Sequence, residues 1–250
     1  MKRALLLTLV LVLTVPVLAR DYEKLMLPIA PSVTYCGYHS KYDTRLVAFN
    51  GAQRGIERFC SDEICGPLAP NTGTVVTGEY AGGSPPPAFM YVPKDVAADM
   101  QMSLIVESSD TLKPEERSYT ELPVVRESDF RAGKIQIVGV RMDDGFRKTL
   151  RIYGLDGATP ALVRVRVYAL RSNTPAYEHD YWLLPQSGAN EAGLDSAPTF
   201  NMECDLTHYV ENYGAPVRVE LEPLTEGAKI WGFVSITNNV TQHFYTVVPR

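Results

Sequence analysis

Four cysteines are the residues of this chain with the clearest chemical potential. Cys60 and Cys65 are separated by four residues, and Gly66-Pro67 follows directly, which favours a turn that brings the two thiols together. A disulfide between Cys60 and Cys65 is therefore expected in an oxidising compartment. Four cysteines allow three pairings in all, and by elimination the second bridge joins Cys36 to Cys204.

The same cysteines have a second interpretation as metal ligands. Cys36 and His39, followed by Cys60 and Cys65, place three thiols and one imidazole in an order that resembles a zinc site. The 20 residues between His39 and Cys60 fit no standard zinc finger, and exported thiols are usually oxidised before they meet a metal. We therefore expect disulfides, with no metal and no other cofactor.

A group of aromatic residues could bind sugars. Tyr177, Tyr181 and Trp182 lie close together in the sequence near a loop, and exposed aromatic rings can hold ligands by stacking. Simple packing in the core is the competing interpretation of these three side chains. By contrast, Trp231 lies in a segment that is apolar on both faces, which predicts a central strand with a buried tryptophan.

No motif of the sequence indicates catalysis. The chain contains no G-x-S-x-G segment, no P-loop and no G-x-G-x-x-G segment, and its four histidines form no H-x-x-x-H pair. Asp143-Asp144-Gly145 lacks the alternating oxygen ligands of a calcium loop, and between two strands it predicts a hairpin turn. We therefore expect that the protein is not an enzyme.

Residues 1–19 have the three parts of a secretory signal. Lys2 and Arg3 precede an apolar run from Ala4 to Val15, and small residues follow at positions 17–19. The run is about a dozen residues long, whereas a membrane-spanning helix needs roughly 20. We expect the mature chain to be secreted or periplasmic, with no integral membrane segment after removal of the signal.

The charge of the chain disfavours nucleic acid as a partner. Asp and Glu total 29 and exceed the 24 Lys and Arg, and no run of basic residues occurs. Removal of residues 1–19 changes the net charge from −5 to −7, because this segment holds two cations and no anions. The expected partner is therefore an unknown protein or a polysaccharide, and not a nucleic acid.

Hydrophobic residues recur with a period of two, which is typical of strands. In Leu162–Tyr168 valines alternate with arginines, and Val217–Glu222 and Lys148–Tyr153 repeat the pattern. These segments predict half-buried antiparallel strands, with Arg151 among the solvent-facing residues. Met202–Tyr209 could form a short helix or 3₁₀ turn. Further strands are expected at Asp43–Phe49, Thr74–Tyr80, Ala88–Val92, Met100–Glu107, Tyr119–Val125, Lys134–Val140, Tyr181–Leu184, Lys229–Thr237 and Gln242–Val248.

The strands predict an all-β fold of two tandem antiparallel β-sandwich domains, immunoglobulin-like and with little helix. Thr44–Asn50 resembles Lys148–Gly154, as expected for a weak internal repeat. The predicted domains are residues 20–128 and 129–250. One large sandwich is the alternative.

Two segments, Leu122–Phe130 and Ile230–His243, resemble uncharacterised exported bacterial proteins that are built of β-sandwich domains. The resemblance implies a sandwich fold and export, and it implies no activity.

Three functions are compatible with these features. The leading one is a non-catalytic exported module that takes part in surface, matrix or envelope interactions. The second is a carbohydrate-binding module that uses Tyr177, Tyr181 and Trp182. The third is a two-domain periplasmic chaperone that donates a strand to its client.

The signal segment makes a prediction about processing. We expect N-terminal sequencing of exported protein to begin at or near Arg20, because the residues before it match the cleavage pattern of a signal peptidase. A folded, soluble cytoplasmic product that retains Met1 would contradict this prediction.

Overall fold

The computed structural model describes residues 22–28, 40–56, 67–77, 88–186, 195, 197–208, 210 and 215–249. In this part of the chain the strands form four antiparallel sheets, which confirms the predicted all-β fold. The predicted signal segment, residues 1–19, lies outside the described residues, as do Cys36, Cys60 and Cys65.

The first half of the chain supplies two of the sheets. Sheet 1 contains β4 (Ala88–Pro93), β1 (Tyr22–Leu27) and β7 (Val125–Arg126), in that order. Sheet 2 contains β3 (Thr72–Thr77), β2 (Ser40–Asn50), β5 (Met100–Asp110) and β6 (Lys113–Leu122). The short helix α1 (Lys94–Ala97) connects β4 to β5.

The second half supplies the other two sheets. Sheet 3 contains β12 (Thr199–Glu203), β9 (Phe146–Gly154), β14 (Ile230–Asn238) and β15 (Phe244–Val247). Sheet 4 contains β11 (Tyr177–Leu183), β10 (Ala161–Ala169), β13 (Val217–Pro223) and β8 (Ile135–Val140). Two 3₁₀ turns, η1 (Glu127–Asp129) and η2 (Leu206–His208), lie outside the sheets.

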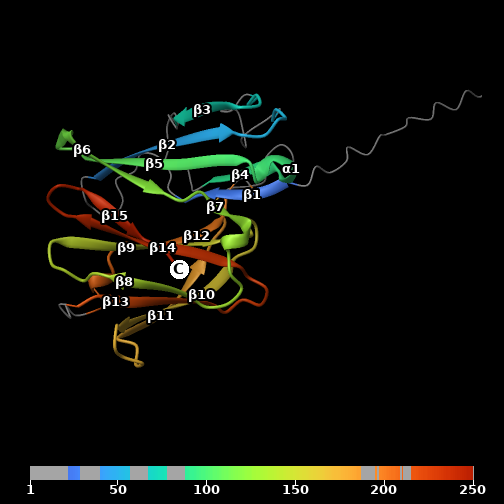
Figure 1. The fold of residues 1–250 in the computed structure, drawn as a ribbon. Helices are drawn as coiled ribbons and strands as arrows, with labels where there is room; N and C mark the ends of the chain where they lie inside the picture. Colours follow the sequence, from blue (N-terminus) through green and yellow to red (C-terminus); the bar gives the residue numbers. More distant parts are fainter. Residues whose placement is uncertain are drawn as a thin grey trace, which may run out of the picture.

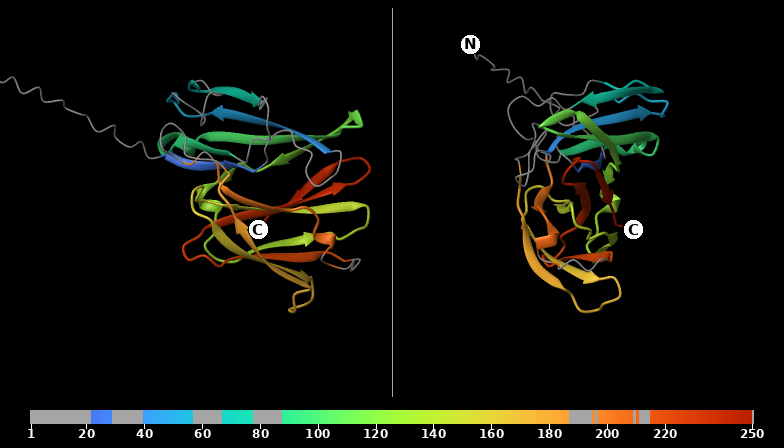
Figure 2. Two further views of the ribbon diagram at one scale, coloured as in Figure 1. Left: turned by 180° about the vertical axis from the view of Figure 1, so that it is seen from behind. Right: turned by 90° about the vertical axis from the view of Figure 1, so that its left-hand side faces the viewer.

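The sheets are stacked in layers. Figure 1 shows sheet 2 at the top and sheet 4 at the bottom, with the strands of sheets 1 and 3 between them. Both views of Figure 2 show the same order. Sheets 2 and 4 therefore each have one outer face, on opposite sides of the molecule.

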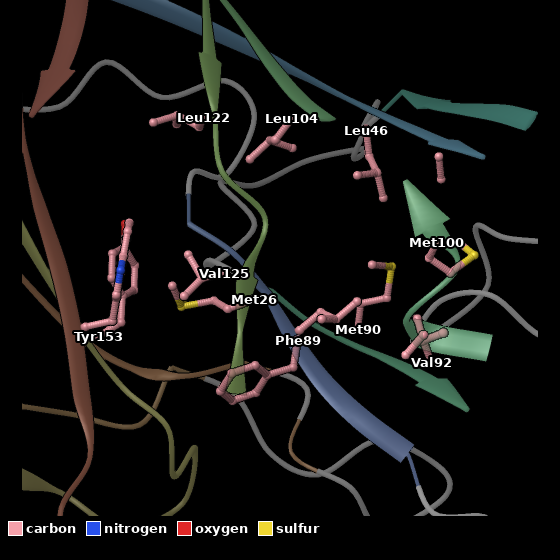
Figure 3. Packing of buried hydrophobic residues seen from close by; sticks show 14 of the residues in the cluster. Met26, Leu46, Phe89, Met90, Val92, Met100, Leu104, Leu122, Val125 and Tyr153 are labelled. Atoms are coloured by element: carbon pink, nitrogen blue, oxygen red, sulfur yellow. The ribbon is translucent and has the colours of Figure 1, made fainter. Parts of the chain in front are cut away.

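Sheet 3 is buried on both of its faces, because β9 and β14 lie inside the stack. On one face Leu150 and Val234 belong to the apolar core that sheet 3 shares with sheet 4. On the other face Tyr153 and Phe233 belong to the core that contains the apolar residues of the first half. Figure 3 shows that Tyr153 faces the part of the core that contains Met26 and Val125 of sheet 1.

A glycine lets sheets 3 and 4 approach closely at β14. A Cβ atom on Gly232 would lie 2.7 Å from the carbonyl oxygen of Arg151 and 2.8 Å from Cδ1 of Leu221. Real Cβ atoms essentially never approach other atoms so closely. Only glycine therefore fits this position without displacing backbone.

Polar contacts also join the two halves along β15. Thr120 donates a hydrogen bond of 2.6 Å from its hydroxyl to the carbonyl of Phe244, and Ser108 donates one of 2.9 Å to the carbonyl of Gln242. The ring of Tyr42 meets the ring of Phe244 edge to face, with 5.4 Å between the centroids. Sheet 2 and sheet 3 are thus in direct contact where sheet 1 does not separate them.

Most of the predicted elements are present. Each predicted strand corresponds to an observed one, the Met202–Tyr209 segment contains a 3₁₀ turn, and Trp231 is buried as expected. The prediction missed β1 and β12, and it merged β7 with the end of β6 in one strand, Tyr119–Val125.

Two local predictions are wrong. The turn at Asp143-Asp144-Gly145 is present, with Gly145 at a φ of 78°, but it does not form a hairpin, because β8 and β9 belong to different sheets. The Lys148–Tyr153 strand is not half-buried, since neighbouring sheets cover both of its faces. A period of two shows that a strand has two faces, and it does not show whether a second layer covers the polar one.

The predicted boundary at residues 128 and 129 follows the sheets, since the described strands of each sheet come from one half only. The apolar cores do not follow it, because Tyr153, Trp231, Phe233 and Phe244 complete the core of the first half. The division into two domains, and their immunoglobulin-like character, stay predictions.

Expression of the two halves tests how far the shared core binds them together. We expect residues 20–128 alone to aggregate or remain unfolded, because separation exposes apolar side chains such as Met26, Phe89 and Val125. We expect co-expression with residues 129–250 to restore a soluble complex, measured by gel filtration and circular dichroism against the full chain. A cooperatively folded, monomeric first half would instead support two independent domains.

Candidate functional site

Sheet 4 presents one buried face and one outer face. Along β10, Val163, Val165 and Val167 are fully buried against sheet 3, and Arg164 and Arg166 point the opposite way because successive side chains of a strand alternate. The outer face is therefore built by the residues between the valines and by their cross-strand neighbours. We call this outer face of sheet 4 the Trp182 face.

An apolar row crosses the Trp182 face at one end. Trp182 in β11 lies directly opposite Leu162 in β10, and Leu224, just after β13, donates its backbone N–H to the carbonyl of Leu162 at 2.8 Å. Trp182 is 53% exposed, and Leu224 is 39% exposed. Asn201 holds the backbone of Trp182 through a 2.8 Å hydrogen bond to its carbonyl.

A charged row lies beside the apolar one, two residues along each strand. Arg164 lies opposite Asp180 on one side and opposite Glu222 on the other. Its Nε and Nη2 atoms bind the two carboxylate oxygens of Asp180 at 2.7 and 2.9 Å. Such a bidentate pair fixes the guanidinium group in one orientation.

A second charged row follows. Arg166 contacts Glu178 of β11, and it also binds Glu220 at 3.0 Å and Glu222 at 2.5 Å. Lys134 adds an ion pair of 3.3 Å to Glu220. Arg164 and Arg166 thus form ion pairs with acidic side chains of both neighbouring strands on the outer side of sheet 4.

The structure does not bring the three predicted sugar-binding aromatics together. Tyr177 and Tyr181 lie on the inner side of sheet 4, whereas Trp182 lies on the outer side. The hydroxyls of Tyr177 and Tyr181 are 2.8 Å apart, and that of Tyr181 donates to Glu203 at 3.0 Å. Burial and the neighbouring Tyr177 and Glu203 raise the pKa of Tyr181, so this hydroxyl stays protonated. Of the predicted platform, only Trp182 faces solvent on sheet 4.

Arg151 is also placed differently from the prediction. It lies on β9, 7% exposed, with its Nη1 atom 2.6 Å from the hydroxyl of Ser235 and its guanidinium 5.6 Å from the ring centre of Phe233. The cause is the layer above sheet 3, which covers the face that a two-layer sandwich would leave open. Arg151 therefore does not contribute to the Trp182 face.

Cys204 follows β12, and its carbonyl accepts a hydrogen bond of 2.9 Å from the hydroxyl of Thr149. It is not a free thiol. Its pairing with Cys36 and the bridge between Cys60 and Cys65 stay predictions, because those three cysteines lie outside the described residues. Among the residues that the structure describes, no group of three or more His, Cys, Asp or Glu side chains could hold a metal ion.

A cavity of about 550 Å³ lies where β1 meets the end of sheet 3. Lys24 lines it from the first half, and its Nζ atom binds Asp195 at 2.9 Å and the carbonyl of Leu155 at 3.2 Å. The carbonyl of Asp195 also accepts a hydrogen bond from Tyr91. Lys24 is thus engaged in joining the two halves, which makes the cavity a weaker candidate than the Trp182 face.

No protein-family model, curated protein or solved structure matches this chain. In the part of the chain that the structure describes, no helix is both long and apolar enough to cross a membrane.

Sequence reasoning missed Leu162, Leu224 and Asp180 as parts of the site. The alternation along β10 could have placed Leu162 beside Arg164 on the outer face. Nothing in the local sequence shows that Trp182 and Leu224 flank Leu162, because this depends on the pairing of β10 with the next strand, β11, and with the more distant β13.

Glu220 gives the Trp182 face a measurable pH dependence. Burial acts to raise the pKa of Glu220, but hydrogen bonds from Arg166 and Lys134 hold the net pKa below its ordinary value of 4.5. A carboxyl with a lowered pKa in the folded protein stabilises the fold above the unfolded-state pKa, and this stabilisation is lost as the pH falls. We expect Glu220→Gln to lower the free energy of unfolding at pH 7 and to weaken its decrease on acidification.

Urea unfolding of the wild type and of Glu220→Gln, from about pH 7 down to about pH 3, measures this effect. Glu115→Gln is a matched control, because Glu115 is exposed and forms no hydrogen bond or ion pair with the described residues. If Glu220→Gln and the wild type lost the same stability on acidification, Glu220 would not contribute to the pH dependence.

Proposed function

We propose that this protein is a non-catalytic exported module of the cell surface, matrix or envelope, and that it binds a carbohydrate chain on the Trp182 face. The observation that carries the proposal is the exposed indole of Trp182 on a strand face, beside Leu162, with Leu224 next in the same apolar row. Aromatic rings with an apolar surface and a polar edge suit ligands that are part apolar and part wet, as the faces and edges of sugar rings are.

The neighbouring charged row supports this choice of ligand. Asp180, Arg164 and Glu222 lie within about 7 Å of the apolar row, since two residues of a strand span that distance. Their polar atoms can exchange hydrogen bonds with hydroxyl groups at the edge of a sugar ring that stacks on Trp182. A binding site needs this combination of apolar area and a few fixed polar groups.

Removal of the indole tests the proposal. We expect Trp182→Ala to weaken binding to a polysaccharide about ten-fold or more, since the lost aromatic contact is of the order of 1.4 kcal/mol or larger. Affinity electrophoresis in gels that contain single polysaccharides measures the binding, and the change in migration gives the dissociation constant.

Tyr119→Ala is the matched control. Tyr119 is an equally exposed aromatic residue, 58% exposed, on the outer face of sheet 2 at the opposite side of the molecule. We expect this variant to migrate like the wild type in every gel. If no polysaccharide retarded the wild type, or if Tyr119→Ala lost as much affinity as Trp182→Ala, the proposed function would be wrong.

A further inference from the structure

We infer that the ligand of the Trp182 face is an uncharged polysaccharide. The inference rests on the proposed function and adds the chemical class of the ligand. It follows from how the charges of this face are paired and from which hydrogen-bonding atoms remain open.

The charges of the Trp182 face balance. Its described side chains include four cations and four anions, and each of them takes part in an ion pair within the face. The cations are Lys134, Arg164, Arg166 and Arg218, and the anions are Glu178, Asp180, Glu220 and Glu222.

An anionic ligand would have to compete with these internal pairs. Arg166 already meets Glu178, Glu220 and Glu222, so a sulfate or carboxylate of a ligand could bind it only by displacing a carboxylate. A cationic ligand faces the same competition from the arginines. Strong recognition of charged polymers normally uses basic side chains that no acid neutralises.

Hydrogen-bond donors remain open beside the apolar row. Asp180 uses Nε and Nη2 of Arg164, and among the described residues no hydrogen bond or ion pair involves Nη1. Arginine has five N–H donors in a rigid fork, so the two N–H groups of Nη1 stay available to a ligand. Because Asp180 holds the fork in place, little rotamer freedom is lost when a ligand binds. Neutral hydroxyl groups can use such donors without breaking an ion pair.

The first experiment compares polysaccharides of different charge. We expect affinity electrophoresis to show retardation of the wild type by a neutral polysaccharide such as a glucan, mannan or galactan, and none by alginate, polygalacturonate or heparin. We expect the dissociation constant to change less than about two-fold between low and high salt, because screening acts on charge–charge attraction.

Arg164→Ala tests the open donors. We expect it to weaken neutral-polysaccharide binding by about ten-fold, while Arg45→Ala leaves it unchanged. Arg45 is a matched control, because it forms a 3.1 Å ion pair with Glu107 on the outer face of sheet 2. Equal unfolding temperatures of the two variants ensure that a loss of affinity does not reflect a loss of fold.

The second experiment changes the charge of the face. The double substitution Asp180→Asn and Glu222→Gln keeps the shapes of both side chains and leaves two cations in excess. We expect this variant to bind alginate or heparin at low salt and to release it at high salt. A double variant that still ignores anionic polymers would contradict the argument from charge balance.

The outcomes separate the inference from the proposed function. Retardation by anionic polysaccharides only, dependent on Trp182 and abolished by salt, would overturn the inference and leave the proposed function standing. Binding of no polysaccharide at all would overturn both, and so would a protein partner that co-purifies with the wild type but not with Trp182→Ala while every polysaccharide gel is negative.

Discussion

Burial of sheet 3 on both faces is the constraint on which the rest of this structure depends. Its strands β9 and β14 contribute Leu150 and Val234 to the core with sheet 4, and Tyr153 and Phe233 to the core of the first half. One sheet therefore supplies apolar surface to two cores at once. Neither core is complete without it, so the two halves of the chain are stabilised together although their hydrogen-bonded sheets are separate.

This constraint places charged residues in the interior. The Nη1 atom of Arg147 binds Gln242 at 2.9 Å, and its Nη2 atom lies 3.4 Å from the hydroxyl of Tyr42 in the first half. Burial acts to raise the pKa of Tyr42, but the positive charges of Arg151 and Arg147 bring it below its ordinary value. Lys148 is fully buried, burial lowers its pKa, and its ammonium group donates to the carbonyl of Phe146 at 2.6 Å. Buried charged and polar groups lose their hydration, which costs a large amount of free energy. These contacts compensate for that loss.

The charged residues of the Trp182 face, by contrast, do not lie between two sheets, because nothing covers the outer side of sheet 4 in the described structure. There the arginines and carboxylates pair across strands. The partly exposed Arg164–Asp180 pair contributes little to stability, whereas Glu220 is buried beneath its cationic partners. The main effect of these pairs is to orient polar atoms next to the exposed ring of Trp182. A face that folding does not require to be buried is thus available for binding, and its pairing suits a ligand without charge.

The sequence by itself determined the strands, because alternation with a period of two is a local property of residues such as Val163, Arg164 and Val165. It also determined the burial of Trp231, whose neighbours are apolar on both sides of the strand. Only the tertiary structure decided that Arg151 is buried whereas Arg164 is partly exposed, although both alternate with apolar residues in the same way. It likewise decided that Trp182 joins Leu162 and Leu224, whereas its separation from Tyr177 and Tyr181 follows from alternation along β11. The physical reason is that alternation defines two faces for each strand, whereas the stacking of distant sheets determines which faces meet water.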